Sequence, residues 1–168
     1  PSEEDEDLDA IVAFAREASE LRRKSKQVPA QVNISINTLI PKPHTPFQWL
    51  KMEGLEGMKR RHTYLKSKIK SGRLELNLHN PYMSMLEGLL CRGDRRLSKV
   101  ILAAFRQGAR FDAWADHFRF DLWMNAFAEC GIEPDAYLKE RPKEEILPWD
   151  FLDMGISKEQ LISDSQYY

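Results

Sequence analysis

The sequence predicts an α/β fold in which helices predominate, and three observations lead to this prediction. Two short stretches, residues 31–40 and 74–78, alternate apolar and polar side chains with the period of a β-strand. Most other apolar residues recur every three or four positions, which is the period of a helix. From Asn80 onward only the helical period is found. We therefore divide the chain into an α/β segment, residues 1–79, and an all-helical segment, residues 80–168.

Composition excludes several classes of protein. The 168 residues are 42% hydrophobic and 30% charged, with a formal net charge of −1, which favours a folded domain over intrinsic disorder. No apolar run approaches the roughly 20 residues of a membrane span, so we expect no membrane association and a cytoplasmic location. The two cysteines, Cys91 and Cys130, lie too far apart for a disulfide framework, and no metal site is predicted.

The first helix and strand follow from local signals. Ser2 precedes a run of acidic residues that the helix dipole stabilises, and apolar residues at helical spacing predict a helix to about Lys24. The next element is a strand over Gln31–Ile40, with Val32, Ile34 and Ile36 on one face.

The rest of the α/β segment contains a stiff loop, a helix and a second strand. Three prolines between Pro41 and Pro46 prevent both helix formation and strand pairing. A helix is predicted from Leu55 to Ile69, closed at Ser71-Gly72, and a strand at Leu74–Leu78. We expect Gln31–Ile40 to pair with Leu74–Leu78, to pair with a second copy of itself, or to fray.

The all-helical segment is divided by caps and glycines. Asn80-Pro81 begins a short helix, and Asp94 is a candidate cap for the helix that follows Gly93. A longer helix is predicted to bury Trp114, Trp123 and Phe127 and to end at Cys130-Gly131. Residues 132–153 are predicted to be a loop, and residues 157–164 the last helix.

Several strings resemble motifs of a known family. Residues 32–49 read VNISINTLIPKPHTPFQW, and residues 84–87 and 92–96 read SMLE and RGDRR. The first string resembles the final barrel strand and exit loop of radical S-adenosylmethionine iron-sulfur proteins of the oxidoreductase type, and the others resemble a motif downstream in that family. Residues 108–112 and 147–150 are similar to further motifs of the family.

The resemblance implies that this chain is part of a larger cytosolic enzyme. Family members begin with a cobalamin-binding-like domain, and their radical barrel holds a [4Fe-4S] cluster through a Cys-x-x-x-Cys-x-x-Cys motif. This chain lacks that motif, so the cluster ligands would precede Pro1. The chain would then be the last strand and helix of a partial (β/α) barrel, followed by a helical extension. The parent would cleave S-adenosylmethionine to a 5′-deoxyadenosyl radical, and this segment would be inactive alone.

The polar side chains of the first strand have two interpretations. Asn33, Ser35 and Asn37 share one face, and such a face is either solvated or lines a cavity. Because the interior of a catalytic barrel is polar where ligands bind, the resemblance favours the cavity. It implies that Ser35 and Asn37 contact S-adenosylmethionine and that Asn33 contacts substrate.

The proline-rich loop and an arginine cluster supply the other candidates. Loops at the carboxyl ends of barrel strands carry ligand-binding residues, so Lys42 and Thr45 are assigned to the cofactor and His44 to substrate. The alternative is a rigid structural loop. Arg92, Arg95 and Arg96 could clamp an anionic substrate, because guanidinium groups bind carboxylate and phosphate through paired hydrogen bonds. Alternatively, they form a helix corner in which Asp94 caps a helix and pairs with an arginine.

A basic run from Lys59 to Arg73 leads to a second hypothesis of function. It contains seven cations at positions 59, 60, 61, 66, 68, 70 and 73 and no acidic residue. Such a run either tracks a phosphate backbone or is a solvated helix face. The alternative function is therefore a helical module that recruits RNA or a partner protein to the catalytic core.

Overall fold

The computed structural model describes residues 3–69 and 72–167, which form two compact units. The first unit runs to Thr38 and resumes over Leu55–Pro81, and the second comprises Leu39–Gly54 and the chain from Tyr82 onward. The elements are α1 (Asp5–Lys26), β1 (Val32–Ile36), α2 (Leu55–Lys68), β2 (Leu74–Leu78), α3 (Pro81–Cys91), α4 (Leu97–Arg106), α5 (Phe120–Glu129), α6 (Asp135–Leu138), α7 (Lys158–Asp164) and the 3-10 turn η1 (Ser165–Tyr167). The fold is α/β and mostly helical, as predicted.

The first unit is built on a parallel pair of strands. β1 and β2 pair from Val32 opposite Leu74 to Ile36 opposite Leu78, and α2 forms the crossover between them. Of the three outcomes expected for the first strand, pairing with Leu74–Leu78 is therefore the one that the structure shows. β1 is shorter than the predicted 31–40, because β2 offers only five residues to pair with and the chain then enters the proline-rich loop.

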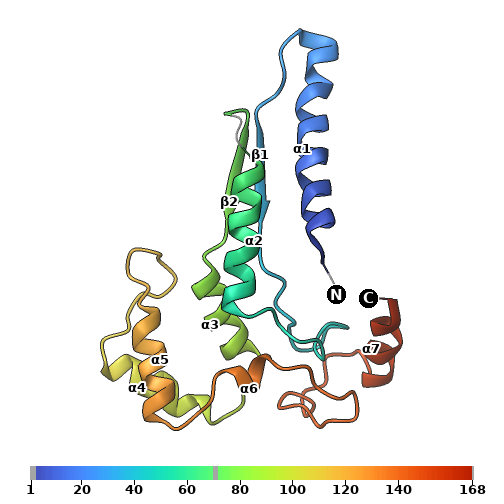
Figure 1. The fold of residues 1–168 in the computed structure, drawn as a ribbon. Coiled ribbons are helices and arrows are strands. Elements are labelled where there is room, and N and C mark those ends of the chain that lie inside the picture. The colour runs from blue at the N-terminus through green and yellow to red at the C-terminus, as the bar shows by residue number, and fades with distance from the viewer. Residues whose placement is uncertain (1–2, 70–71, 168) are drawn as a thin grey trace. The chain divides into compact units, whose positions relative to one another are not determined.

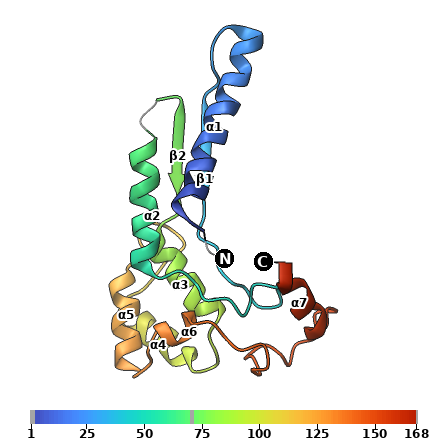
Figure 2. The same cartoon turned by 45° about the vertical axis from the view of Figure 1, so that its right-hand side comes forward.

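Helices α1 and α2 pack on the apolar side of this sheet (Figures 1 and 2). Leu8 and Val12 of α1 meet Leu65 of α2 in one cluster, and Ala15 of α1 meets Ile34 and Leu74 in a second. Apolar strand residues at alternating positions supply the rest of this core: Val32, Ile36, Leu76 and Leu78.

The first helix begins at Asp5, three residues after Ser2, where the sequence placed its cap. Glu4 is the N-cap of α1, and a reciprocal capping box joins the side chain of Glu4 to the amide of Asp7 and the side chain of Asp7 to the amide of Glu4. Ser2, which the sequence placed at this cap, lies outside the described residues, as do Lys70 and Ser71 at the end of the second helix.

The second unit packs the proline-rich loop together with the C-terminal helices. Trp49 is buried with Leu147, Trp149 and Leu161, and the amide of Met52 donates to the carbonyl oxygen of Leu138 over 2.9 Å. Residues 39–54 thus pack with the C-terminal part of the chain, whereas the division at Asn80 grouped them with the first strand.

The helix predicted across Trp114 to Phe127 is shorter than expected. α5 begins only at Phe120, and Trp114, assigned to the core, is 62% exposed. Phe111 adopts a left-handed φ of 56°, and the amides of Trp114 and His117 donate to carbonyl groups three residues earlier. The chain therefore forms isolated turns here, which apolar spacing alone does not distinguish from a helix. Trp123 and Phe127 are buried as predicted.

Among the helices in the described part of the chain, none combines the length with the apolar composition needed to cross a membrane.

Candidate functional site

One face of the parallel sheet carries polar side chains and is uncovered. Asn33 lies opposite Glu75 and Ser35 opposite Asn77, and all four residues are exposed. We call these four residues the polar sheet face. Asn37, one residue beyond β1, is also exposed. Parallel sheets are usually covered on both faces, but the packing helices named above contact only the apolar side of this one.

The polar sheet face can bind a polar ligand through a hydroxyl, two amides and a carboxylate. The sequence singled out Asn33 and Ser35 but missed Glu75 and Asn77. Their alternation with Leu74, Leu76 and Leu78 was the available signal, and the parallel register is what places them beside the first two residues.

Lys42 and Thr45 of the proline-rich loop belong to the second unit, and both have partners within it. The ammonium group of Lys42 lies 2.8 Å from Oε1 of Glu87, and this carboxylate raises the pKa of Lys42. The hydroxyl of Thr45 donates to the carbonyl oxygen of Lys42 over 2.7 Å. These contacts fix the shape of the loop and attach it to α3.

Arg92 is fully buried and holds the same loop from inside the second unit. Its Nε donates to the carbonyl oxygen of Tyr137 over 2.8 Å, and its Nη2 to that of Lys139 over 2.7 Å. Its Nη1 lies 3.4 Å and 3.3 Å from the carbonyl oxygens of Pro41 and Gln48. Burial, with the charge of Arg141, lowers the pKa of Arg92 to about 10. The structure therefore gives Arg92 a structural role in place of the anion clamp that the sequence suggested.

Gln48 is a second buried link that the sequence did not single out. Its Oε1 accepts a hydrogen bond from the amide of His44 at 3.0 Å and another from the indole Nε1 of Trp149 at 2.7 Å. This contact orients the left-handed turn at His44, where φ is 56°, against the loop that carries Trp149. A buried side-chain amide between two distant segments leaves no periodic signal in the sequence.

The remaining two arginines of the cluster differ from each other. Arg96 forms a paired contact with Asp94, with donor–acceptor distances of 2.7 and 3.0 Å, and its amide also donates to Asp94. This confirms the pairing within a helix corner, although Arg96, rather than Asp94, is the N-cap of α4. Arg95 is exposed, and its guanidinium group has no hydrogen bond or ion pair among residues 3–69 and 72–167.

A cavity of about 390 Å³ brings two of the predicted substrate residues together. His44 lines it from the proline-rich loop and Arg95 from the turn before α4, and Cys91, Trp149 and Phe151 also contribute. All of these residues belong to the second unit. The predicted residues Asn33, Ser35 and Asn37 belong to the first unit and do not line it.

Three basic residues of α2 pair with acidic residues in α1 and just before it. Arg60 pairs with Asp5 at 3.1 Å and Arg61 with Glu3 at 2.9 Å, while Lys68 lies 2.8 Å from Asp9. Lys59 pairs with Glu56 within its own helix. The basic run was the reason for the RNA-binding hypothesis. Acidic residues near the start of the chain neutralise three of its seven cations, Arg60, Arg61 and Lys68.

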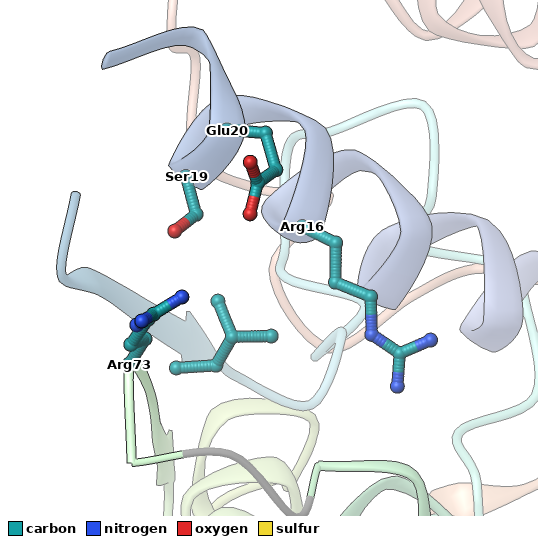
Figure 3. Close-up of a pocket in the computed structure, with 5 residues that line it drawn as sticks. Arg16, Ser19, Glu20 and Arg73 are labelled. Carbon is teal, nitrogen blue, oxygen red and sulfur yellow. The ribbon is translucent and has the colours of Figure 1, made fainter. Parts of the chain in front are cut away.

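A second cavity, of about 320 Å³, lies in the first unit. Figure 3 shows Arg16, Ser19 and Glu20 projecting from α1 beside Arg73, which precedes β2. Two of these side chains already bind backbone, because Arg16 donates to the carbonyl oxygen of Lys68 over 2.9 Å and Ser19 donates to that of Ala30. These bonds tie α1 to the last residue of α2 and to the loop that precedes β1.

Comparison with known proteins gives one informative relative. An uncharacterized protein of Methanocaldococcus jannaschii is 26% identical over 133 residues, which is 79% of this chain and 28% of the relative. The chain therefore spans little more than a quarter of the length of that relative. No family model matches the chain, and no solved structure matches it.

Proposed function

We propose that this chain is the C-terminal segment of a radical S-adenosylmethionine iron-sulfur oxidoreductase, and that β1 and β2 belong to the closing part of its (β/α) barrel. One observation carries the proposal: the sheet is parallel, its helices lie on one side only, and the other side is polar. A doubly wound sheet would need an apolar second face beneath further helices. A barrel places helices outside and polar ligand-binding residues inside.

The length of the relative is compatible with this proposal. Its remaining 72% could hold the other barrel strands and the cluster-binding cysteines, which this chain does not supply. The motifs of residues 32–49 and 84–96, which resemble the radical S-adenosylmethionine family, give the proposal its chemistry. In that chemistry, a cluster held upstream supplies the electron that cleaves S-adenosylmethionine.

The residues of this chain would bind and orient the cofactor. Ser35 and Asn37 would donate and accept hydrogen bonds along the strand, with Asn33 nearer the substrate. Lys42 and Thr45 would act by holding the shape of the exit loop, because the structure pairs them with Glu87 and with the loop backbone. We therefore assign these two to positioning rather than to direct cofactor contact.

The test uses the full-length parent protein, reconstituted anaerobically with iron and sulfide. Ser35→Val and Asn37→Val should lower the rate of 5′-deoxyadenosine formation by about 5- to 150-fold, since each removes a hydrogen bond worth roughly 1–3 kcal/mol. Ile34→Val, on the packed face, is the matched control and should keep the rate within about twofold. Normal cleavage in both polar variants would refute the site, and absence of cluster absorption in the parent would refute the family assignment.

The RNA-recruiting module receives less support from the structure. A phosphate-tracking surface needs cations available to phosphate, and Arg60, Arg61 and Lys68 already pair with acidic residues between Glu3 and Asp9. Titration of the chain with single-stranded RNA at two salt concentrations tests this alternative. Tight binding that weakens steeply with salt would favour the module over the enzyme segment.

A further inference from the structure

The cavity of the second unit is lined by two residues with polar atoms that lack a partner in the described part of the chain. Arg95 has no ionic partner in the described part of the chain, and Nε2 of His44 is shielded from solvent without a hydrogen bond. Both residues line the cavity, although they are far apart in sequence. The exposed guanidinium group of Arg95 is available to a ligand, whereas the unpaired, shielded ring nitrogen of His44 is costly to maintain and reaches a ligand only if the imidazole turns towards the cavity.

The acidic groups around the cavity are already neutralised. Asp94 is paired with Arg96, Glu87 with Lys42, and Asp150 with Lys158 at 2.9 Å. The Cys91 thiol adds no charge near neutral pH, because burial raises its pKa. Of these three acids only Asp94 lines the cavity, and its charge is already offset by Arg96, so Arg95 remains an unpaired cation for a negatively charged ligand.

Much of the remaining cavity lining is apolar. Trp149 is buried and held by its bond to Gln48, whereas Phe151 and Leu152 are 79% and 49% exposed. Exposed aromatic and aliphatic side chains at the mouth of a cavity can cover the apolar part of a ligand. The volume of about 390 Å³ falls within the range of small-molecule sites, about 300–1,000 Å³.

We propose that this cavity binds a small molecule that carries a carboxylate or phosphate group on an apolar, ring-sized body. The guanidinium group of Arg95 would hold the oxyanion through paired hydrogen bonds, and the His44 imidazole would donate to the ligand after turning its shielded Nε2 into the cavity. Phe151 and Leu152 would close over the apolar body. The site goes beyond the proposed barrel function, because it lies within the second unit and depends on no residue of the sheet.

The proposal can be tested on the 168-residue chain by NMR titration of backbone amides. The probes are phenyl phosphate and 3-phenylpropanoate, which separate a phosphate from a carboxylate source. Benzyl alcohol is the uncharged control, and inorganic phosphate is the control without an apolar body. At least one organic anion should give saturable shifts at Arg95, Trp149 and their neighbours, and should bind more tightly than either control.

Two variants distinguish this site from adventitious binding. Arg95→Met should weaken binding at least about tenfold, whereas Arg106→Met, which removes the same charge from the end of α4, should change it less than about twofold. His44→Asn tests the imidazole and preserves the left-handed turn, which Asn tolerates; it should also weaken binding. A thermal unfolding curve establishes that each variant is folded.

Three results would overturn the proposal. The first is that neither organic anion gives saturable shifts at the cavity below about 10 mM. The second is that folded Arg95→Met binds as tightly as the unsubstituted chain. The third is that benzyl alcohol binds as well as the anions, which would make the cavity a purely apolar site. If phenylpropanoate alone binds, the oxyanion is a carboxylate; if phenyl phosphate alone binds, it is a phosphate.

Discussion

Arg92, the residue that follows α3, donates a hydrogen bond from Nε to the carbonyl oxygen of Tyr137 over 2.8 Å. The two residues lie 45 positions apart in the sequence. Its two terminal nitrogens reach three more carbonyl oxygens, two of them in the proline-rich loop. One buried cation therefore ties the loop, α3 and α6 of the second unit together. The dipoles of these carbonyl groups stabilise the positive charge of the guanidinium group. The buried arginine therefore needs no direct contact with a carboxylate, and none is found in the described part of the chain.

Arg92→Met should destabilise the chain by about 3 kcal/mol, because it leaves several buried carbonyl groups without a donor. Arg92→Lys should recover little of this loss, since an ammonium group does not reproduce the planar set of donors. Urea unfolding followed by circular dichroism measures both values. Arg106→Met is the exposed control and should change stability by less than about 0.5 kcal/mol. A loss below about 1 kcal/mol for Arg92→Met would show that water replaces the guanidinium group.

The two faces of β1 should respond differently to substitution in the chain itself. Ile34 is buried against Ala15 and Leu74, so Ile34→Ala should cost about 2–4 kcal/mol. Ser35, its exposed neighbour, should tolerate alanine within about 0.5 kcal/mol. Chemical unfolding of both variants provides the measurement. Equal losses would mean that the polar sheet face is packed in solution.

Gly93 should resist substitution because of packing. A Cβ at this position would overlap the side chain of Leu97 and approach the carbonyl oxygen of Leu89 to 3.0 Å. Gly93→Ala should therefore cost about 1–3 kcal/mol. Gly54→Ala is the matched control, because a Cβ there meets no atom within 4 Å, and it should be neutral or slightly stabilising. Thermal midpoints of the two variants in the opposite order would contradict this packing.

Asp150 should make stability depend on acid pH. Burial alone would raise its pKa, but the amide of Leu147 and the ammonium group of Lys158 outweigh burial and hold the pKa below the ordinary 3.8. A depressed folded-state pKa contributes stability above pH 3.8, and this contribution is lost as the pH falls through the lower folded-state value.

Asp150→Asn should therefore be less stable than the unsubstituted chain at pH 7, by roughly 1 kcal/mol. The difference should shrink towards zero as the pH falls below 3.8. Urea midpoints of both proteins between pH 7 and pH 2 measure it. A difference that stays constant down to pH 2 would show that the asparagine perturbs packing rather than removing a charge.

Local features of the fold were predictable from the sequence because they depend on neighbouring residues. The alternation of Val32, Ile34 and Ile36 determined both the strand and the side that packs, since successive side chains of a strand point to opposite faces. The last helix was equally local, and its Ser157 cap accepts a hydrogen bond from the amide of Gln160. Trp114 was misassigned because helical spacing continued through a segment that forms turns.

Contacts between distant segments were decided only by the tertiary structure. The sequence left Arg92, Arg95 and Arg96 open between an anion clamp and a helix corner. The structure separates them into a buried link, a guanidinium group without a partner in the described part of the chain, and an ion-paired corner. It also brings His44 and Arg95 to one cavity, and Glu75 and Asn77 beside the polar residues of β1. The reason is physical: periodicity and capping act over about one helical turn or one strand, whereas burial and partner choice depend on which segments meet when the chain packs.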